Sequence, residues 1–244
     1  MRTAPLFFYL FLFYNYPMDE KIKIFQKLEE TFKNNGFSLY LVGGTVRDYL
    51  LKLPLTDMDA VTDATPKEME KFISDANFRF AEYGSVTYKI EGIKFDITTL
   101  RKEAGYADSR HPNKIEFVKD LTIDVKRRDF TINGLYLDSQ LKVLDYVGGV
   151  NDLNNKIICM IGEPKNRLKE DPLRIIRAIR FSIDFNFAVD SELDKAIKES
   201  VSLLDNLNID KIKMDIKKIR CPDKEMIMQR FSDYNIKHLL DVIE

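Results

Sequence analysis

Two aspartates separated by one residue, Asp57 and Asp59, follow a glycine pair at Gly43-Gly44. Side chains alternate between the faces of a β-strand, so a strand over 56–61 places both carboxylates on one face, roughly 7 Å apart along the backbone. Carboxylates at this spacing suit divalent cations, and adjacent glycines let backbone N–H groups approach a polyphosphate. Such a pair also arises by chance on solvent-facing strands. With the glycines upstream, it predicts Mg²⁺-dependent phosphoryl or nucleotidyl transfer.

The secondary-structure pattern changes near residue 150. Before it, short alternating segments follow a predicted helix at 20–34; after it, the spacing of apolar residues is helical. The polar segment 101–112 is expected to be a mobile loop. We therefore predict an α+β fold, with a mixed β-sheet and flanking helices at 18–150 and an all-α domain at 151–244. Strands are predicted at residues 38–42, 56–61, 78–83, 85–90, 93–100, 115–118, 135–137 and 143–147.

The bulk composition restricts the kinds of partner. The formal net charge is −1, so attraction to RNA has to come from a local patch of lysine and arginine, such as the lysine-rich segment 211–220. Cys159 and Cys221 have no CxxC partner and are expected to be reduced thiols of a cytoplasmic protein. Residues 1–17 form an apolar N-terminal extension, whose stretch 6–14 is too short to span a membrane. An upstream extension is favoured over a targeting segment, and no membrane contact is expected.

A third carboxylate, Asp96, lies on another predicted strand. Alternation along 93–100 places Asp96 on the polar face with Lys94 and Thr98. Three acidic groups from two strands are enough to hold two Mg²⁺ ions about 4 Å apart. Asp96 is therefore a candidate catalytic residue beside the aspartate pair.

A basic segment, Arg127-Arg128-Asp129-Phe130-Thr131-Ile132-Asn133, follows the polar region. The forked guanidinium groups of arginine suit phosphate oxygens, and an asparagine can bind a ribose hydroxyl. The alternative is a charged loop that leads into a helix capped by Asp129. The segment alone does not decide between the two readings.

Acidic and basic residues are paired again at Glu170-Asp171-Pro172-Leu173-Arg174. Pro172 suits the first turn of a helix, which makes Asp171 a plausible N-cap. Cytosine and adenine both present an amino donor beside a ring-nitrogen acceptor, and a carboxylate beside a guanidinium complements that pair. Asp171 with Arg174 would thus accept CTP and ATP and reject GTP and UTP. The plainer alternative is a capped helix with a basic face, formed by Arg174, Arg177 and Arg180.

Taken together, four segments resemble the motifs of class II (bacterial-type) tRNA nucleotidyltransferases and poly(A) polymerases. Their order and spacing along the chain also agree with that family, and the likeness extends over about residues 35–190. The four segments are Leu41–Asp59, Arg127–Asn133, Asp145–Leu153 and Glu170–Phe181.

The resemblance implies a polymerase-β-like nucleotidyltransferase head at 18–150 and a helical, base-reading neck at 151–244. It implies that Asp57 and Asp59 bind Mg²⁺ and that Asp96 is the third catalytic carboxylate. Segment 101–119 matches a flexible loop that helps to change specificity from C to A. The implied nucleotide-binding residues are Gly43, Gly44, Arg47, Arg128, Asp129, Asn133, Asp171, Arg174, Arg177 and Arg180.

The implied activity is addition of C and A from CTP and ATP to the 3′ end of tRNA. An enzyme that adds only CC, only A, or a poly(A) tail is an alternative. Such enzymes continue into helical body and tail domains, whereas this sequence stops at Glu244. The expectation is a C-terminally short form whose tRNA-binding tail is missing or supplied by a second chain; the alternative of another class is an inactive nucleotide- or RNA-binding remnant.

Overall fold

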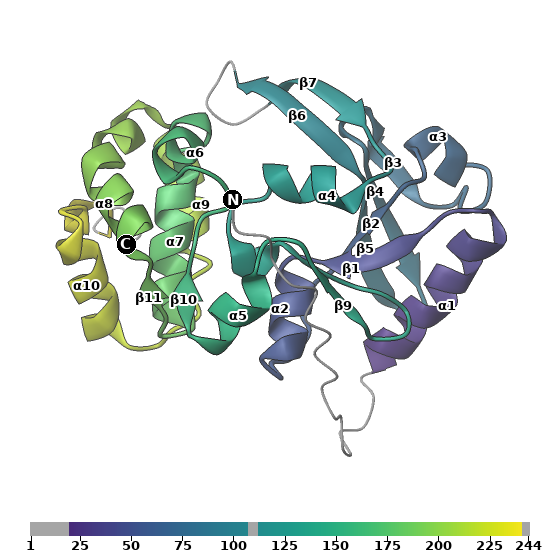
Figure 1. Ribbon diagram of the computed structural model, residues 1–244, viewed down its shortest axis with the longest axis horizontal. Helices are drawn as coiled ribbons and strands as arrows, with labels where there is room; N and C mark the ends of the chain where they lie inside the picture. The colour runs from purple at the N-terminus through teal and green to yellow at the C-terminus, as the bar shows by residue number, and fades with distance from the viewer. Residues whose placement is uncertain (1–19, 107–111, 241–244) are drawn as a thin grey trace.

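The computed structural model describes residues 20–106 and 112–240. Side chains are described for the same residues except 104–106 and 112–114. The predicted extension at 1–17 lies outside these ranges. The chain forms a sheet-based half and a helical half that lie side by side (Figure 1). No helix of the described residues has the length and apolar character needed to cross a membrane.

A seven-stranded mixed sheet forms the first half, in the order β3-β4-β5-β2-β1-β8-β9. Strands β2 and β5 pair in parallel and the other neighbours are antiparallel, which confirms the predicted mixed sheet. The strand predicted at 56–61 begins two residues later, so Asp57 directly precedes it. The strands are β1 (Leu39–Val42), β2 (Met58–Thr62), β3 (Asn77–Phe80), β4 (Ser85–Ile90), β5 (Ile93–Thr99), β8 (Leu135–Leu137) and β9 (Val143–Asp145).

The two faces of the sheet are covered differently. Helices α1 (Glu20–Asn34) and α3 (Pro66–Met69) pack on one face, where Phe25, Leu28 and Phe32 of α1 join the main core of this half. The other face carries a smaller cluster with helix α4 (Leu121–Asp124) and the following 3₁₀ turn Val125–Arg127. Asp59 and Asp96 alternate with core residues of the first face. The carboxylates therefore belong to the less covered face.

The expected mobile loop at 101–112 is wrong for the residues that are described. Strands β6 (Arg101–Tyr106) and β7 (Pro112–Phe117) form an antiparallel ribbon, with Arg101 opposite Phe117. The ribbon is not part of the main sheet and extends from its edge (Figure 1). Residues 107–111, with His111, lie outside the described chain.

Helices form the second half. Helix α7 (Leu173–Asp184) lies at its centre, and Phe130 and Ile132 from the sheet-based half join the same core. A short parallel pair, β10 (Ile157–Ile158) with β11 (Ala188–Val189), ties two of its loops together. The other helices are α5 (Gly149–Asn154), α6 (Pro164–Glu170), α8 (Ser191–Ser200), α9 (Ile209–Ile216) and α10 (Lys224–Asp233).

The connection between the halves is a tight turn held by one carboxylate. Oxygens of Asp145 accept hydrogen bonds from four successive backbone N–H groups, those of residues 147–150, at 2.8–3.1 Å. Gly149 is buried here, and a Cβ on it would lie 2.1 Å from the carbonyl oxygen of Thr131. The turn therefore requires glycine at this position for steric reasons.

Gly149→Ala is expected to lower the free energy of unfolding by about 3 kcal/mol or more, because the clash is with backbone that cannot rotate away. Chemical denaturation measures the change. Gly148→Ala is the matched control: Gly148 has a φ of 81° but nothing within 4 Å of its would-be Cβ, so only backbone strain of about 1–2 kcal/mol applies. Equal losses in the two variants would contradict the steric argument.

Candidate active site

The predicted aspartate pair lines one cavity. Asp57 and Asp59 both face a space of about 690 Å³ between the sheet and helix α7. Thr45 fixes their position, since its hydroxyl donates to the carbonyl of Asp57 at 3.0 Å and accepts from the N–H of Asp59 at 2.9 Å. The glycine turn and the carboxylates are therefore joined through one threonine hydroxyl. Sequence reasoning assigned no role to Thr45.

The third candidate, Asp96, is beside Asp59 but differently engaged. The two are direct register partners on β2 and β5. Asp96 accepts a hydrogen bond from Thr87 Oγ1 at 2.7 Å and forms an ion pair with Lys94 at 2.8 Å. Asp96 lines neither this cavity nor the neighbouring cavity that contains Asp171 and Arg174. Asp96 is thus held next to the pair by its own strand neighbours.

Negative charge is concentrated at Asp59. Burial, together with the charges of Asp57 and Asp96, raises the pKa of its carboxyl to about 6. Anionic oxygens that repel one another in this way are suitable ligands for a hard divalent cation. Among the described residues, no three His, Cys, Asp or Glu side chains gather closely enough to hold a metal ion. The residues suited to bind a divalent cation are therefore Asp57 and Asp59.

The predicted glycine turn leads directly into helix α2 (Gly44–Leu50). Gly43 has φ 66° and ψ −131°, a conformation essentially restricted to glycine. Its N–H donates to the carbonyl of Leu135 on strand β8 at 3.3 Å. The first amides of α2 have no acceptor within the helix, so they can donate to an anion placed beside the turn.

Arg47 joins the two walls of the cavity. Its guanidinium lies 5.0 Å from the ring centroid of Phe181 and 4.6 Å from that of Phe185, both on or next to helix α7. It also donates to Asp48 at 2.7 Å and to Asn133 Oδ1 at 2.7 Å. Arg47 is buried and lines the cavity, and these four contacts hold it in place.

A second cavity of about 570 Å³ adjoins the first. The two share Asp129, Asn133 and Arg177, so they form one cleft with two compartments. Arg128 and the predicted base readers Asp171 and Arg174 line the second compartment. The cleft therefore brings together the carboxylate pair, the basic segment and the acidic–basic pair, from three separate parts of the chain.

The ion pairs of the second compartment differ from the expected one. Asp171 contacts Arg177 at 2.5 Å, whereas Arg174 contacts Glu170 at 3.1 Å. Asp171 is also not the N-cap of α7: the cap is Pro172, and Asp171 Oδ1 accepts from the N–H of Leu173 at 3.1 Å. The guanidinium beside the Asp171 carboxylate is thus that of Arg177, six residues away.

Asp129, which is half-buried, is the second carboxylate partner of Arg177, besides Asp171. It lies 3.5 Å from Arg177 and accepts from Asn133 Nδ2 at 3.1 Å. Burial would raise the pKa of Asp129, but the charge of Arg177 and the hydrogen bond of Asn133 outweigh it and lower the pKa. The alternative of a helix cap does not hold, because Asp129 precedes only a 3₁₀ turn, Thr131–Asn133.

A network centred on Asp124 holds the basic segment, and the sequence patterns did not reveal it. The fully buried carboxylate of Asp124 accepts from Arg127 Nε at 2.8 Å, Arg128 Nη2 at 2.9 Å and the hydroxyl of Tyr136 at 2.9 Å. Burial would raise the pKa of Asp124, but the charges of Arg128 and Arg127 outweigh it and lower the pKa to about 2. The i+3 and i+4 spacing to the arginines was the only signal available.

Asp124→Asn is expected to lower the free energy of unfolding by about 3–5 kcal/mol at pH 7, because it leaves two buried arginines without their anion. The pKa of Asp124 is lower in the folded than in the unfolded chain, so its contribution is present above about pH 4 and lost as the pH falls toward 2. Chemical denaturation at several pH values should show that the difference in the free energy of unfolding between the variant and wild type becomes smaller as the pH falls over that range. The exposed Asp205→Asn serves as control, and a gap independent of pH would contradict the network.

Basic residues complete the first compartment from the helical half. Arg180 stacks on the ring of Phe181 at 4.6 Å and makes no ion pair with any described residue. Beyond helix α9, Lys217, Lys218 and Arg220 also line this compartment, and Arg220 lies 3.5 Å from Asp48. Part of the lysine-rich segment predicted to attract RNA therefore faces the cleft.

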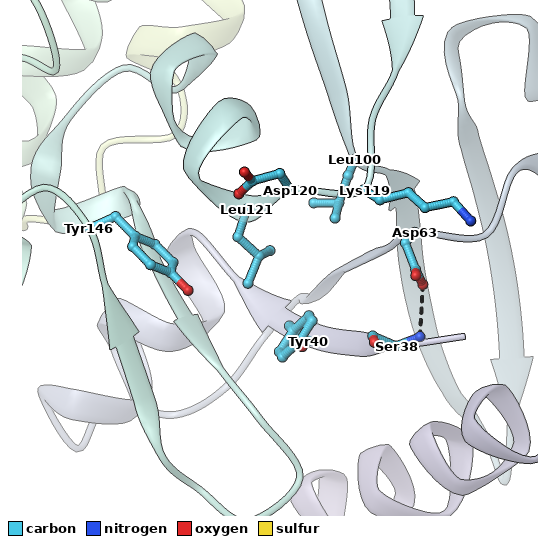
Figure 2. Close-up of a pocket in the computed structure, with 8 residues that line it drawn as sticks. All are labelled: Ser38, Tyr40, Asp63, Leu100, Lys119, Asp120, Leu121 and Tyr146. Carbon is cyan, nitrogen blue, oxygen red and sulfur yellow. Dashed lines mark hydrogen bonds between the residues drawn. The ribbon is translucent and has the colours of Figure 1, made fainter. Parts of the chain in front are cut away.

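A separate hollow of about 270 Å³ lies on the same face of the sheet, beyond helix α4. Figure 2 shows Tyr146 at its left, Tyr40 below its centre, and Asp63, bonded to the N–H of Ser38 at 2.8 Å, at its right. Among described residues, it has no lining residue in common with either compartment of the cleft. It is therefore distinct from the candidate site.

Known proteins with a similar sequence or fold are nucleotide-adding enzymes. Residues 39–159 match the family described as the poly A polymerase head domain. The CCA-adding enzyme of Staphylococcus epidermidis is 38% identical over 200 residues, which are 81% of this chain and 50% of that protein. That of Ligilactobacillus salivarius is 39% identical over 205 residues, covering 84% of this chain and 51% of that one.

Solved structures extend the similarity to the fold. The crystal structure of the Bacillus stearothermophilus CCA-adding enzyme in complex with CTP superposes with a TM-score of 0.81 at 28% identity, over 90% of this chain and 53% of that chain. A tRNA-processing enzyme with CTP gives 0.69 at 28% identity, over 88% and 57%. The chain spans about half the length of the curated relatives it matches.

Proposed function

Because the chain belongs to the class II tRNA nucleotidyltransferase and poly(A) polymerase family, we propose that it adds C and A from CTP and ATP to the 3′ end of tRNA. The observation that carries the proposal is the cleft itself. The glycine turn and the carboxylates of Asp57 and Asp59 lie in one compartment, and an acidic–basic pair suited to base edges lines the adjoining one. The curated relatives named above are CCA-adding enzymes, which favours this activity over addition of CC, of A alone, or of a poly(A) tail.

In the proposed reaction, the 3′-hydroxyl of the RNA attacks the α-phosphate of the nucleotide and pyrophosphate leaves. The first-turn amides after Gly43 and Gly44, together with Arg47, Arg180 and Arg128, orient the triphosphate, and Asn133 with Asp129 orients the ribose. Asp96, next to Asp59 in the sheet, helps to take the proton of the attacking hydroxyl. The role of Asp96 is assigned from its pairing with Asp59, and the other side chains are assigned from their positions along the cleft.

Divalent metal is part of this proposal, and we assign it as Mg²⁺. Asp57 and Asp59 would hold it, because Thr45 anchors both beside the glycine turn, whereas Asp48 and Asp129 of the same compartment are paired with arginines. When bound, the metal supplies charge that lowers the pKa of the hydroxyl and neutralises the phosphates. It would also relieve the mutual repulsion that raises the pKa of Asp59.

Choice of the base is assigned to the second compartment. Asp171 offers an acceptor to the exocyclic amino group that cytosine and adenine share. A guanidinium beside it, that of Arg177 or Arg174, offers a donor to the ring nitrogen. Guanine and uracil would place a carbonyl oxygen against the carboxylate, so GTP and UTP are rejected.

Catalysis and base selection are assigned to different halves of the chain. We propose a nucleotidyltransferase head at 18–150 and a base-reading neck at 151–244, with the tRNA 3′ end entering the cleft between them. The free thiols Cys159 and Cys221 are compatible with a reducing compartment, and we propose that the protein acts in the cytoplasm.

The decisive experiment incubates the protein with tRNA that lacks its 3′ CCA, Mg²⁺ and each labelled nucleotide in turn. Addition of C followed by A, stopped by chelation of the metal and restored by Mg²⁺, is the expected result. Addition of A alone, of CC alone or of long A tails would replace CCA addition by a narrower activity. Nucleotide binding without any addition would overturn the proposal in favour of an inactive remnant.

A further inference from the structure

Two exposed aromatic side chains lie at the outer end of the second compartment. Phe80 is 54% exposed and Tyr83 is 44% exposed, and both line the cavity that also contains Asp171 and Arg174. Large aromatic groups at the mouth of a polar cavity are unusual on a surface that meets only water, and they mark binding sites. The proposed reaction, as derived so far, gives them no role.

The turn that carries these side chains is firmly held. The 3₁₀ turn Ala81–Tyr83 ends at Gly84, whose carbonyl accepts from the N–H of Thr99 at 2.8 Å. The ring of Phe117 on the ribbon packs onto Gly84, where a Cβ would lie 2.6 Å from it. Arg101 Nη1 donates to the carbonyl of Tyr83 at 2.5 Å. Both the sheet and the ribbon therefore fix the position of the aromatic pair.

The surroundings are electrically suited to a nucleic acid. Of the residues that the structure describes, five arginines and three acidic residues line this compartment, an excess of two positive charges. Arg101 and Arg127 lie next to the aromatic end, and Glu103 bridges them at 2.7 and 3.5 Å. Aromatic rings beside a basic lining are the usual combination for unpaired bases of a single strand.

The aromatic pair is also correctly placed relative to the carboxylates. The cavity floor includes Ser85 and Thr98, which are register partners on β4 and β5. Asp96 is two residues before Thr98, roughly 7 Å away along the strand. A base stacked on Phe80 or Tyr83 would therefore lie close to the strand that carries Asp96, in the compartment that Asp171 and Arg174 also line.

We propose that Phe80 and Tyr83 form a stacking platform for the unpaired 3′-terminal base of the acceptor RNA. The inference rests on the proposed nucleotide addition and specifies how the second substrate is held. The platform binds the strand that is extended, and Asp171 with its arginines binds the nucleotide that is added. Stacking explains how one site can accept an end that changes from one base to another, since every base has an aromatic face.

The first test measures the KM for RNA and for CTP in Tyr83→Ala and Phe80→Ala. Each variant is expected to raise the KM for RNA roughly tenfold to a hundredfold, with the KM for CTP nearly unchanged. Tyr83→Phe keeps the ring and should resemble wild type. Tyr146→Ala is the matched control, because Tyr146 is 47% exposed and lines the separate hollow of Figure 2. An unchanged KM for RNA, or an equal rise for CTP, would overturn the platform.

The second test removes the base rather than the ring. Binding is measured with an RNA hairpin whose unpaired 3′-terminal nucleotide either carries its base or is abasic. The wild-type protein should bind the abasic hairpin with lower affinity than the complete hairpin. Tyr83→Ala should lower the affinity for the complete hairpin by the same factor. The variant should bind the complete and the abasic hairpin with equal affinity. A base effect that persists in Tyr83→Ala would contradict stacking on this residue.

The two proposals fail in different ways. If wild type binds the hairpin with a base-dependent affinity that Tyr83→Ala abolishes but adds no nucleotide, nucleotide addition is wrong and the platform stands. If wild type adds nucleotides and shows no preference for the complete over the abasic end, the platform is wrong and nucleotide addition stands. Thermal melting of each variant confirms that the fold is intact, as expected for exposed positions.

Discussion

Asp59→Asn is expected to lower the rate of nucleotide addition by at least about a thousandfold, which corresponds to about 4 kcal/mol of transition-state stabilisation. Asparagine has nearly the same shape, so the strand and its contact with Thr45 remain. The substitution removes one of the two carboxylates that Thr45 anchors beside the glycine turn. Asp57→Asn is expected to have an effect of similar size. Single-turnover rates with saturating CTP measure both.

The fold should survive this change. Burial and repulsion from Asp57 and Asp96 disfavour the charged form of Asp59, so the metal-free variant should unfold no more easily than wild type at neutral pH. Asp63→Asn is the control, since Asp63 follows the same strand and its carboxylate faces the separate hollow (Figure 2). Undiminished turnover in Asp59→Asn, or an equal loss in the control, would refute the assignment of the metal-binding pair.

Asp171→Ala is expected to reduce the preference for CTP over UTP by about tenfold to a hundredfold. The carboxylate is the acceptor that distinguishes an amino group from a carbonyl oxygen, and one such paired contact contributes about 1–3 kcal/mol of discrimination. Its loss also leaves Arg177 without the partner at 2.5 Å. Competition between labelled CTP and UTP at equal concentration gives the ratio directly. The loss of CTP efficiency should exceed any loss of RNA affinity.

A matched control separates base reading from helix capping. Asp190 accepts a hydrogen bond from the N–H of Glu192 at the start of α8, at 3.0 Å. Asp171 accepts one from the N–H of Leu173 at the start of α7 in a similar way. Asp190, however, lies outside the cleft. Asp190→Ala should reduce stability by about 1 kcal/mol and leave the CTP preference unchanged. If Asp171→Ala retained the preference for CTP, the base would have to be read elsewhere.

Local patterns predicted the parts of the site that lie within single elements. The alternation at residues 57–59 and the glycine pair before it were enough to place both carboxylates beside the turn, because strand geometry fixes which side chains share a face. Thr65 and Glu68 have the sequence spacing of a capping box, and this box is present at the start of α3. The order of the strands was not predictable, since it depends on pairing between segments far apart in the chain.

The wrong or missing predictions involve contacts that no local pattern reports. Strand β6 was expected to be part of a loop because segment 101–112 is polar, and no local pattern reports its pairing with the strand predicted at 115–118. Asp171 was paired with Arg174 because both lie at the start of one predicted helix, but Asp171 contacts Arg177 and Arg174 contacts Glu170. Asp124 seemed an ordinary polar residue, since its partner Tyr136 lies 12 residues away.

The position of Arg47 between Phe181 and Phe185 has a consequence for how the protein meets its ligands. Separating the sheet from helix α7 would remove a guanidinium from two aromatic faces, at a cost of about 2 kcal/mol or more. The width of the cleft is therefore set when the chain folds and not when a nucleotide arrives. Substrates therefore bind to a preorganised cleft, so little of their binding energy is spent on rearranging the protein.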